Sequence, residues 1–171
     1  NINITDLSGI NQVLIEFEGS NHSMSYISGD RWQYANWIPS SVGTYIYTIH
    51  MEDVNGNWNQ VAGSIELLDT TPPNYSNLIE SADPLEFGDT ETIRVKVWDF
   101  SGIFQVLIEF ADLNHSMNYL DNDIWIYDSW TPTEVGTYPY IIYMEDNNYN
   151  WNKLNDSIRV LDSTPPGYSN L

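Results

Sequence analysis

The chain has 171 residues, of which 24 are acidic and 5 are basic, so its formal net charge is −19. A surface of this sign repels the phosphate backbone, which excludes nucleic acid as a partner and favours cations. Cysteine is absent, so no disulfide can reinforce the fold. No apolar run reaches the length of a membrane span. Stability must therefore come from aromatic-rich cores, with bound metal as a further source.

The sequence is a tandem repeat with a period of 93 residues. Residues 1–78 align with residues 94–171 without a gap, and 44 of the 78 aligned pairs are identical. A period of this length fits one small β-sandwich. We therefore predict two like domains, the first over 1–69 and the second over 70–162. Residues 163–171 are then a linker and the start of a next repeat.

The two repeats are joined by the segment Asp69-Thr70-Thr71-Pro72-Pro73, which returns as residues 162–166 with one conservative change. Two successive prolines cannot continue a helix or donate to a sheet ladder, and they hold the backbone extended. The segment is therefore predicted to be a short, stiff joint.

The second repeat is predicted to contain about seven short strands, because turn signals separate its apolar segments and none has a helical period. Residues 93–98 alternate apolar and polar side chains, as in a half-buried strand. The strands are predicted at 75–81, 85–87 beyond an Asp-Pro kink, 93–98, 104–110, 125–130, 136–144 and 157–161. Turns or loops are predicted at 99–102, at 114–117 and over 146–152.

The first repeat lacks the counterparts of residues 79–93. Two explanations remain open. The chain is an excerpt of a longer array, or a neighbouring chain supplies the missing strand in a fibre. The segment Tyr168–Leu171 offers only about half a strand, which favours the excerpt. The first residue, Asn1, also indicates a processed chain or a window of a longer one.

Several motifs recur in the same order in both repeats. Gly-Thr-Tyr at 43–45 and 136–138 is similar to the tyrosine corner of immunoglobulin-like domains, with Tyr47 and Tyr140 where antibody domains carry cysteine. Asp-x-Ser-Gly-Ile, Asp-x-Asn-x-Asn and Asp-Thr/Ser-Thr-Pro-Pro accompany it. Together these motifs resemble the tandem immunoglobulin-like repeats of bacterial and archaeal cell-surface proteins. One departure is Tyr149, which stands where the first repeat has Gly56.

The resemblance implies an all-β fold of two tandem immunoglobulin-like β-sandwich domains. It also implies an extracellular or cell-surface location and a load-bearing or adhesive role. The implied partners are neighbouring copies of the same repeat or chain, and surface glycans.

The acidic loops suggest a calcium site. In a sandwich of this topology, the loops after the second and sixth strands meet the preceding linker at one pole. Calcium binds six to eight hard oxygens from carboxylates, amides and backbone carbonyls. The alternative is that Asp and Asn only form turns by capping their own backbone. The candidate ligands are Asp69, Asp99, Asp146, Asn148 and Asn150 in the second repeat, Asp6, Asp53, Asn55 and Asn57 in the first, and Asp162 for a following domain.

The acceptor pattern for N-linked glycans, Asn-x-Ser/Thr, occurs five times, a mild excess over chance for this composition. Asn21 and Asn114 are the strongest candidates, because the same Asn-His-Ser recurs at a predicted exposed turn. The others are Asn3, Asn74 and Asn155.

Six of the seven tryptophans form equivalent pairs between the repeats, and Trp98 stands alone. The pairs are Trp32 with Trp125, Trp37 with Trp130, and Trp58 with Trp151. Aromatic residues repeated on strands favour packing in the core or at the joint. A sugar-binding face is the alternative, and exposed rather than buried tryptophan would favour it.

Nothing in the sequence indicates catalysis. His22 and His115 have no second His or Cys beside them for zinc, and no serine lies in a strained glycine elbow. The resemblance, taken together with this lack of catalytic motifs, implies a non-enzymatic, glycosylated rod of a prokaryotic, and in particular archaeal, surface protein or extracellular filament. The alternatives are an adhesion or carbohydrate-binding module, and a spacer of a larger secreted enzyme.

Overall fold

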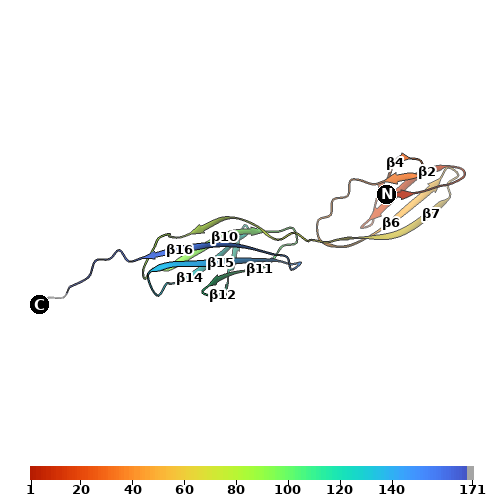
Figure 1. The fold of residues 1–171 in the computed structure, drawn as a ribbon. Helices are drawn as coiled ribbons and strands as arrows, with labels where there is room; N and C mark the ends of the chain where they lie inside the picture. The colour runs from red at the N-terminus through yellow and green to blue at the C-terminus, as the bar shows by residue number, and fades with distance from the viewer. Residues whose placement is uncertain (169–171) are drawn as a thin grey trace. The chain divides into compact units, whose positions relative to one another are not determined.

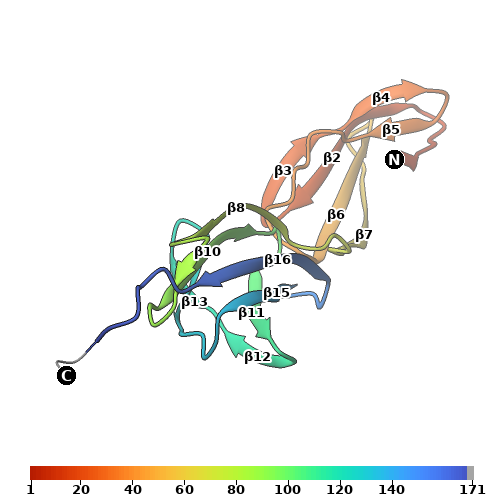
Figure 2. The same cartoon turned by 60° about the vertical axis from the view of Figure 1, so that its left-hand side comes forward.

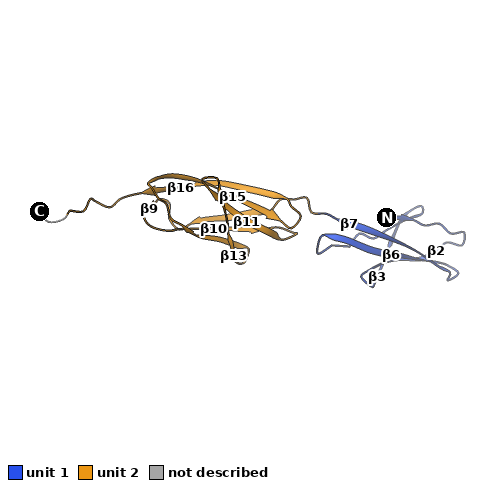
Figure 3. Cartoon of the chain, turned by 90° about the horizontal axis from the view of Figure 1, so that it is seen from below, with its two compact units in different colours: residues 1–68 blue, residues 69–171 orange. Residues whose placement is uncertain are grey.

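The computed structural model describes residues 1–168, and the chain forms two compact units (Figure 3). Unit 1 is Asn1–Leu68 and unit 2 is Asp69–Leu171. The division lies one residue before the predicted boundary, because Asp69 is bound to unit 2. Both units are all-β in the described part of the chain. No helix there is long and apolar enough to cross a membrane.

Unit 2 is a sandwich of two sheets (Figures 1 and 2). Its first sheet has the order β13-β14-β10-β8, and its second has the order β12-β11-β15-β16-β9. The strands are β8 (Asn74–Glu80), β9 (Leu85–Glu86), β10 (Glu91–Trp98), β11 (Ile103–Phe110), β12 (Leu113–Ser116), β13 (Asn118–Asp121), β14 (Ile124–Trp130), β15 (Gly136–Asp146) and β16 (Trp151–Leu161).

This strand order is that of an immunoglobulin-like sandwich. The sheet of β8, β10, β14 and β13 corresponds to strands A, B, E and D, and β11, β15 and β16 correspond to C, F and G. The Asp83–Pro84 peptide bond is cis. After it, β9 lies in the other sheet and pairs in parallel with β16. The predicted kink and the pairing beyond it are confirmed.

The core of unit 2 lies between the two sheets, because each strand turns alternate side chains inward. Ile93, Ile108, Ile142 and Ile158 have no exposed surface. Phe110 stacks on Trp130 with ring centroids 4.6 Å apart and an interplanar angle of 5°. Such aromatic pairs stabilise a core beyond the area they bury.

Unit 1 repeats this architecture without counterparts of β8 and β9. Its sheets have the orders β1-β5-β4 and β3-β2-β6-β7. The register is also repeated, since Val13 pairs with Met51 as Val106 pairs with Met144. The strands are β1 (Ile2–Asn3), β2 (Ile10–Phe17), β3 (Ser20–Ser23), β4 (Ser25–Ser28), β5 (Arg31–Gln33), β6 (Gly43–Asp53) and β7 (Trp58–Leu67).

Two predicted loops are wrong. Residues 114–116 lie on β12, which pairs with β11, and the turn comes earlier, at residues 111–112. The predicted loop over 146–152 is only four residues long, because β16 already begins at Trp151 and pairs with Glu145. Polar residues continue both strands because their side chains lie at sheet edges or on outer faces.

Candidate metal centre

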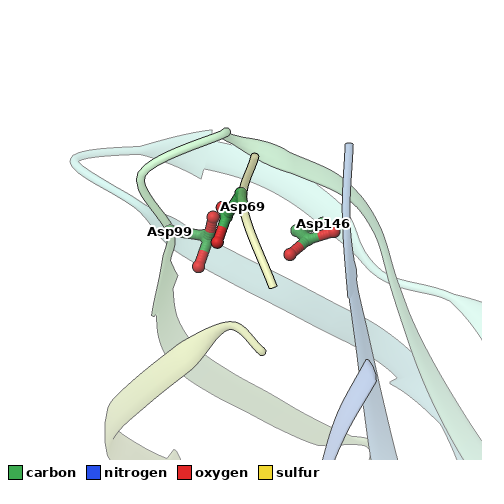
Figure 4. A group of neighbouring side chains, drawn as sticks. All are labelled: Asp69, Asp99 and Asp146. Carbon is green, nitrogen blue, oxygen red and sulfur yellow. The ribbon is translucent and has the colours of Figure 1, made fainter. Parts of the chain in front are cut away.

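Three carboxylates from distant parts of the sequence meet at one end of unit 2 (Figure 4). Asp69 begins the proline-rich linker, Asp99 follows β10, and Asp146 ends β15. One carboxylate oxygen from each lies within 4.8 Å of the others. The convergence that the topology predicted is therefore present.

Asp146 is fully buried and organises the β15–β16 loop. Its Oδ1 accepts hydrogen bonds from the backbone N–H groups of Asn148 and Asn150, at 2.8 and 2.9 Å. Its Oδ2 accepts one from the Asn150 side chain at 2.8 Å. Tyr149 takes the left-handed conformation, with φ of 66°, that Gly56 takes in unit 1 with φ of 82°. Tyrosine in place of glycine at this position therefore leaves the backbone conformation of the loop unchanged.

The other two aspartates are each fixed by a hydroxyl residue two positions later. Asp99 Oδ1 accepts from the backbone N–H and the hydroxyl of Ser101, at 2.8 and 2.9 Å. Asp69 Oδ1 accepts from the same groups of Thr71, at 2.9 and 2.6 Å. These short turns use one oxygen of each carboxylate and leave the other free to face the cluster.

The linker is tied to unit 2 through its backbone carbonyls. The Asn150 side-chain amide donates to the Asp69 carbonyl at 3.2 Å, and that of Asn152 donates to the Pro73 carbonyl at 2.8 Å. Pro73 itself is buried. The linker from Asp69 to Pro73 is thus part of the surface of unit 2.

The electrostatics of the cluster favour a cation. Asp69 Oδ2 is buried and has no hydrogen-bond partner among the described residues. The bond from the Thr71 hydroxyl lowers the pKa of Asp69 to about 2, whereas burial, and then the neighbouring Asp69 carboxylate, raise the pKa of Asp99. The ion pairs in the described part of the chain, His50–Glu16 and Lys96–Asp123, are made by other groups. Three hard oxygen donors that form no ion pair in the described part of the chain suit calcium.

Asn148 and Asn150 were predicted as calcium ligands, and that role stays a prediction. Both asparagines hold the Asp146 carboxylate in place, since Asn148 donates to it from its backbone N–H and Asn150 from its side-chain amide nitrogen. Three residues were missed, namely Thr71, Ser101 and Asn152. The sequence carried a signal for Thr71 and Ser101, because a hydroxyl residue two positions after Asp69 and after Asp99 recurs in the other repeat as Thr164 and Ser8. Asn152 recurs only as Asn59.

Unit 1 contains the corresponding half-site. Asp53 accepts from the backbone of Asn55 and from the backbone and side chain of Asn57, at 2.8 to 2.9 Å, as Asp146 does in unit 2. Asp6 accepts from the backbone and hydroxyl of Ser8, at 2.7 and 2.5 Å. Asp162, the counterpart of Asp69, forms the same turn with Thr164. The Asn57 amide lowers the pKa of Asp53, and the Thr164 hydroxyl lowers that of Asp162.

The predicted glycan acceptors are all exposed, although each lies on a strand rather than in a turn. The three repeated tryptophan pairs divide into two groups. Those at 32, 37, 125 and 130 pack against the cores, as predicted. Trp58 and Trp151 are 52% and 47% exposed, so the expectation of packing fails for this pair.

No family model and no curated protein matches the chain. Among solved structures, it is similar to the fibronectin(III)-like modules of Clostridium thermocellum CbhA, with 12% identity over 98% of this chain and 87% of that one (TM-score 0.43). It is similar to murine CEACAM1b at 13% identity, over 92% of this chain and 88% of that one (TM-score 0.38).

A third similar structure is the Bacteroides ovatus protein SGBP-B, solved in complex with a mixed-linkage heptasaccharide. The identity is 20% over 88% of this chain and 37% of that one (TM-score 0.30). The strand order of unit 2 is that of an immunoglobulin-like β-sandwich, which is the class of protein to which this unit belongs. Unit 1 repeats the strand pairing of unit 2.

Proposed function

We propose that this chain is a structural segment of a prokaryotic, archaeal-type cell-surface protein or extracellular filament. Its immunoglobulin-like domains serve as a glycosylated, non-enzymatic rod, and calcium at the acidic cluster fixes each linker to the domain that follows. The supporting observation is the position of Asp69, which brings a linker carboxylate within 4.8 Å of Asp99 and Asp146. The acidic surface and the exposed acceptor asparagines support an extracellular setting.

Calorimetric melting with saturating calcium and with EGTA tests the metal part of this proposal. Calcium should raise the melting temperature of unit 2, because it binds the folded cluster and not the unfolded chain. Magnesium at the same concentration is the control, since it demands a smaller octahedral site and holds its water more tightly. Identical melting in calcium and in EGTA would remove the calcium from the proposal.

Small-angle X-ray scattering tests the rod. The maximum dimension should be larger and better defined with calcium than with EGTA, because a fixed linker restricts the angle between domains. Replacing Pro72 and Pro73 by glycine should shorten the mean dimension, since glycine frees the backbone. Equal scattering from all these samples would contradict a stiffened joint.

A carbohydrate-binding face is the second candidate, and the exposure of Trp151 favours it. Trp151, Tyr143 and Lys153 line a shallow hollow of about 460 Å³ on unit 2. An aromatic ring beside polar groups suits a sugar ring. Tryptophan fluorescence should be titrated with a panel of oligosaccharides, using Trp151→Ala as the test variant and Trp98→Ala as the matched control. Binding that survives Trp151→Ala would exclude this face.

A further inference from the structure

The outer face of the β15–β16 pair carries an aromatic hollow with a lysine at its side. The hollow has a volume of about 460 Å³, and Tyr143, Trp151, Asn152 and Lys153 line it. Lys153 is the basic member of this set. A volume of this order suits a small organic ligand rather than a bare ion.

Strand pairing places the aromatic rings and the lysine next to one another. Tyr143 lies directly opposite Lys153, and Trp151 lies opposite Glu145, two residues further along β15. Met144, between them on that strand, is fully buried, so Tyr143 and Glu145 point to the outer face of the sheet. Tyr143 and Trp151 are therefore diagonal neighbours, about 7–8 Å apart, which is the width of a sugar ring with its substituents.

The ammonium group of Lys153 has no carboxylate partner in the described part of the chain. The ion pairs there are His50–Glu16 and Lys96–Asp123, and Lys153 is exposed. The sequence has 24 acidic residues against 5 basic ones, so a shortage of carboxylates does not explain this. The ammonium group is available to a carboxylate that a ligand supplies.

Two glutamates near the hollow restrict where a negative charge can lie. Glu145 is 5% exposed, and its Oε2 accepts a hydrogen bond from the Gln105 side chain on β11 at 2.5 Å. Glu109 is also on β11, on the other side of Tyr143 from Lys153. Burial, and then the charge of Glu109, raise the pKa of Tyr143. A ligand carboxylate is therefore repelled on the β11 side and attracted on the β16 side, beside Lys153.

Unit 1 has the same tryptophan without the lysine. Trp58 is 52% exposed and Trp151 is 47% exposed, but Gln60 stands where unit 2 has Lys153. The aromatic surface is thus common to both units, and the positive charge belongs to unit 2 alone. The two contributions can be separated by one substitution.

We propose that this hollow binds an acidic sugar of the uronic acid class. The apolar C–H face of the sugar ring stacks on the indole of Trp151, and the sugar carboxylate forms an ion pair with the ammonium group of Lys153. A charge-assisted contact of this kind is stronger than a neutral hydrogen bond, so it distinguishes acidic from neutral sugars of the same shape. This specificity presupposes the carbohydrate-binding face proposed above as the second candidate function.

The net charge of −19 repels an acidic ligand at long range. Physiological salt screens that repulsion beyond about 8 Å, whereas contact with Lys153 is made within this distance. The titrations are therefore made at physiological ionic strength. They are also made in EGTA, because uronates bind calcium and the acidic cluster of unit 2 must stay free of metal.

Isothermal titration calorimetry should compare short oligomers of galacturonate, mannuronate and glucuronate, each with its neutral, carboxyl-reduced counterpart. At least one uronate oligomer should bind the full chain about tenfold more tightly than its counterpart, as one charge-assisted contact provides. Trp151→Ala should abolish binding of both members of that pair, because the stacking surface is common to them.

Substitutions at Lys153 test the charge directly. Lys153→Gln, which introduces the residue found in unit 1, should reduce the affinity for the uronate oligomer to that for the neutral one. Lys153→Arg should retain the preference, since the positive charge is kept. Lys96→Gln is the matched control, because it removes the same charge from the opposite sheet, where Lys96 is paired with Asp123. Circular dichroism of each variant checks that it is folded.

The outcomes separate the sugar class from the site itself. Equal affinity within every pair of oligomers, or an undiminished preference in Lys153→Gln, would overturn the uronate proposal and leave the carbohydrate-binding face standing. A preference lost equally in Lys96→Gln would assign it to net charge and would also overturn the proposal. Binding of none of the oligomers, acidic or neutral, would reject both the proposal and the carbohydrate-binding face.

Discussion

The hydroxyl of Tyr140 donates a hydrogen bond of 2.6 Å to Glu80 Oε1. This bond joins β15 to β8, and so connects the two sheets of unit 2. Tyr140 is 1% exposed. Burial raises the pKa of both side chains, although the Tyr140 hydroxyl partly lowers that of Glu80.

Tyr140→Phe should destabilise unit 2 by about 1–3 kcal/mol at pH 7, because it leaves a half-buried carboxylate without its donor. The loss should shrink as the pH falls through the raised pKa of Glu80, since a protonated carboxyl tolerates burial better. Chemical denaturation between pH 7 and pH 4 measures both effects. Tyr47→Phe in unit 1 is the control, where no strand equivalent to β8 is present. Equal losses from the two variants would contradict this account.

Asp146→Asn should abolish the calcium-dependent rise in the melting of unit 2. At a calcium concentration one hundred times the Kd, that rise corresponds to about 2.7 kcal/mol. In EGTA the variant should change the melting of unit 2 only slightly. The amide oxygen keeps the two bonds from the loop backbone, whereas the bond from the Asn150 side chain is lost and one of three like charges is removed. Asp162→Asn, which lies outside the unit 2 cluster, is the matched control. An unchanged calcium response would exclude Asp146 as a ligand.

Calcium affinity should fall as the pH falls. The loss should begin at a higher pH than the titration of an isolated aspartate, whose pKa is about 3.9, would predict. Burial and the charge of Asp69 raise the pKa of Asp99, so its proton competes with the metal earlier. Isothermal titration calorimetry from pH 7 to pH 4.5 should show the Kd increasing and protons released on binding. A pH-independent Kd over this range would remove Asp99 from the site.

The two units should melt separately, with unit 1 unfolding first. Fourteen buried apolar side chains form the core of unit 2, and six form that of unit 1. Ile142→Ala should lower the free energy of unfolding of unit 2 by about 2–5 kcal/mol and so shift the higher-temperature transition down. Ile49→Ala should shift the lower-temperature transition, that of unit 1, down in the same way. Differential scanning calorimetry reads both. If each substitution moved both transitions equally, the units would be one cooperative body.

Native material should carry N-linked glycans at Asn21 and Asn114. Both lie exposed on the edge strands β3 and β12, where an attached sugar meets no neighbouring strand. Intact-mass analysis should show hexose-sized additions, and Asn114→Gln should remove one set of them. A bare mass from native material would refute the prediction.

The fold was largely predictable because the repeat and the alternation of side chains are local signals. Ile93, Val95 and Val97 were placed on a core strand by alternation alone, and they are buried. The convergence of Asp69, Asp99 and Asp146 was predictable once the topology was assumed. The Pro-Pro pair marked the linker, since proline restricts the backbone whatever surrounds it.

The remaining features depend on tertiary contacts that no local pattern records. Asn114 looks like a turn residue, yet pairing with Glu109 makes it part of β12. Trp151 looks like a core residue, yet its position opposite Glu145 turns it to the outer face. Ile158 is buried although Ile65, at the equivalent position, is exposed, and this burial depends on the distant strand β8, which covers the core of unit 2.

Tyr149 occupies the left-handed position at the tip of a loop whose hydrogen bonds are those of the glycine-containing loop in unit 1. A side chain there costs about 1–2 kcal/mol in backbone strain, and Tyr149 is 75% exposed. The loop can therefore vary at its outermost residue while the carboxylate beneath it stays fixed. The sequence of the tip and the position of the carboxylate are therefore independent of each other, and tyrosine and glycine serve equally well at this place.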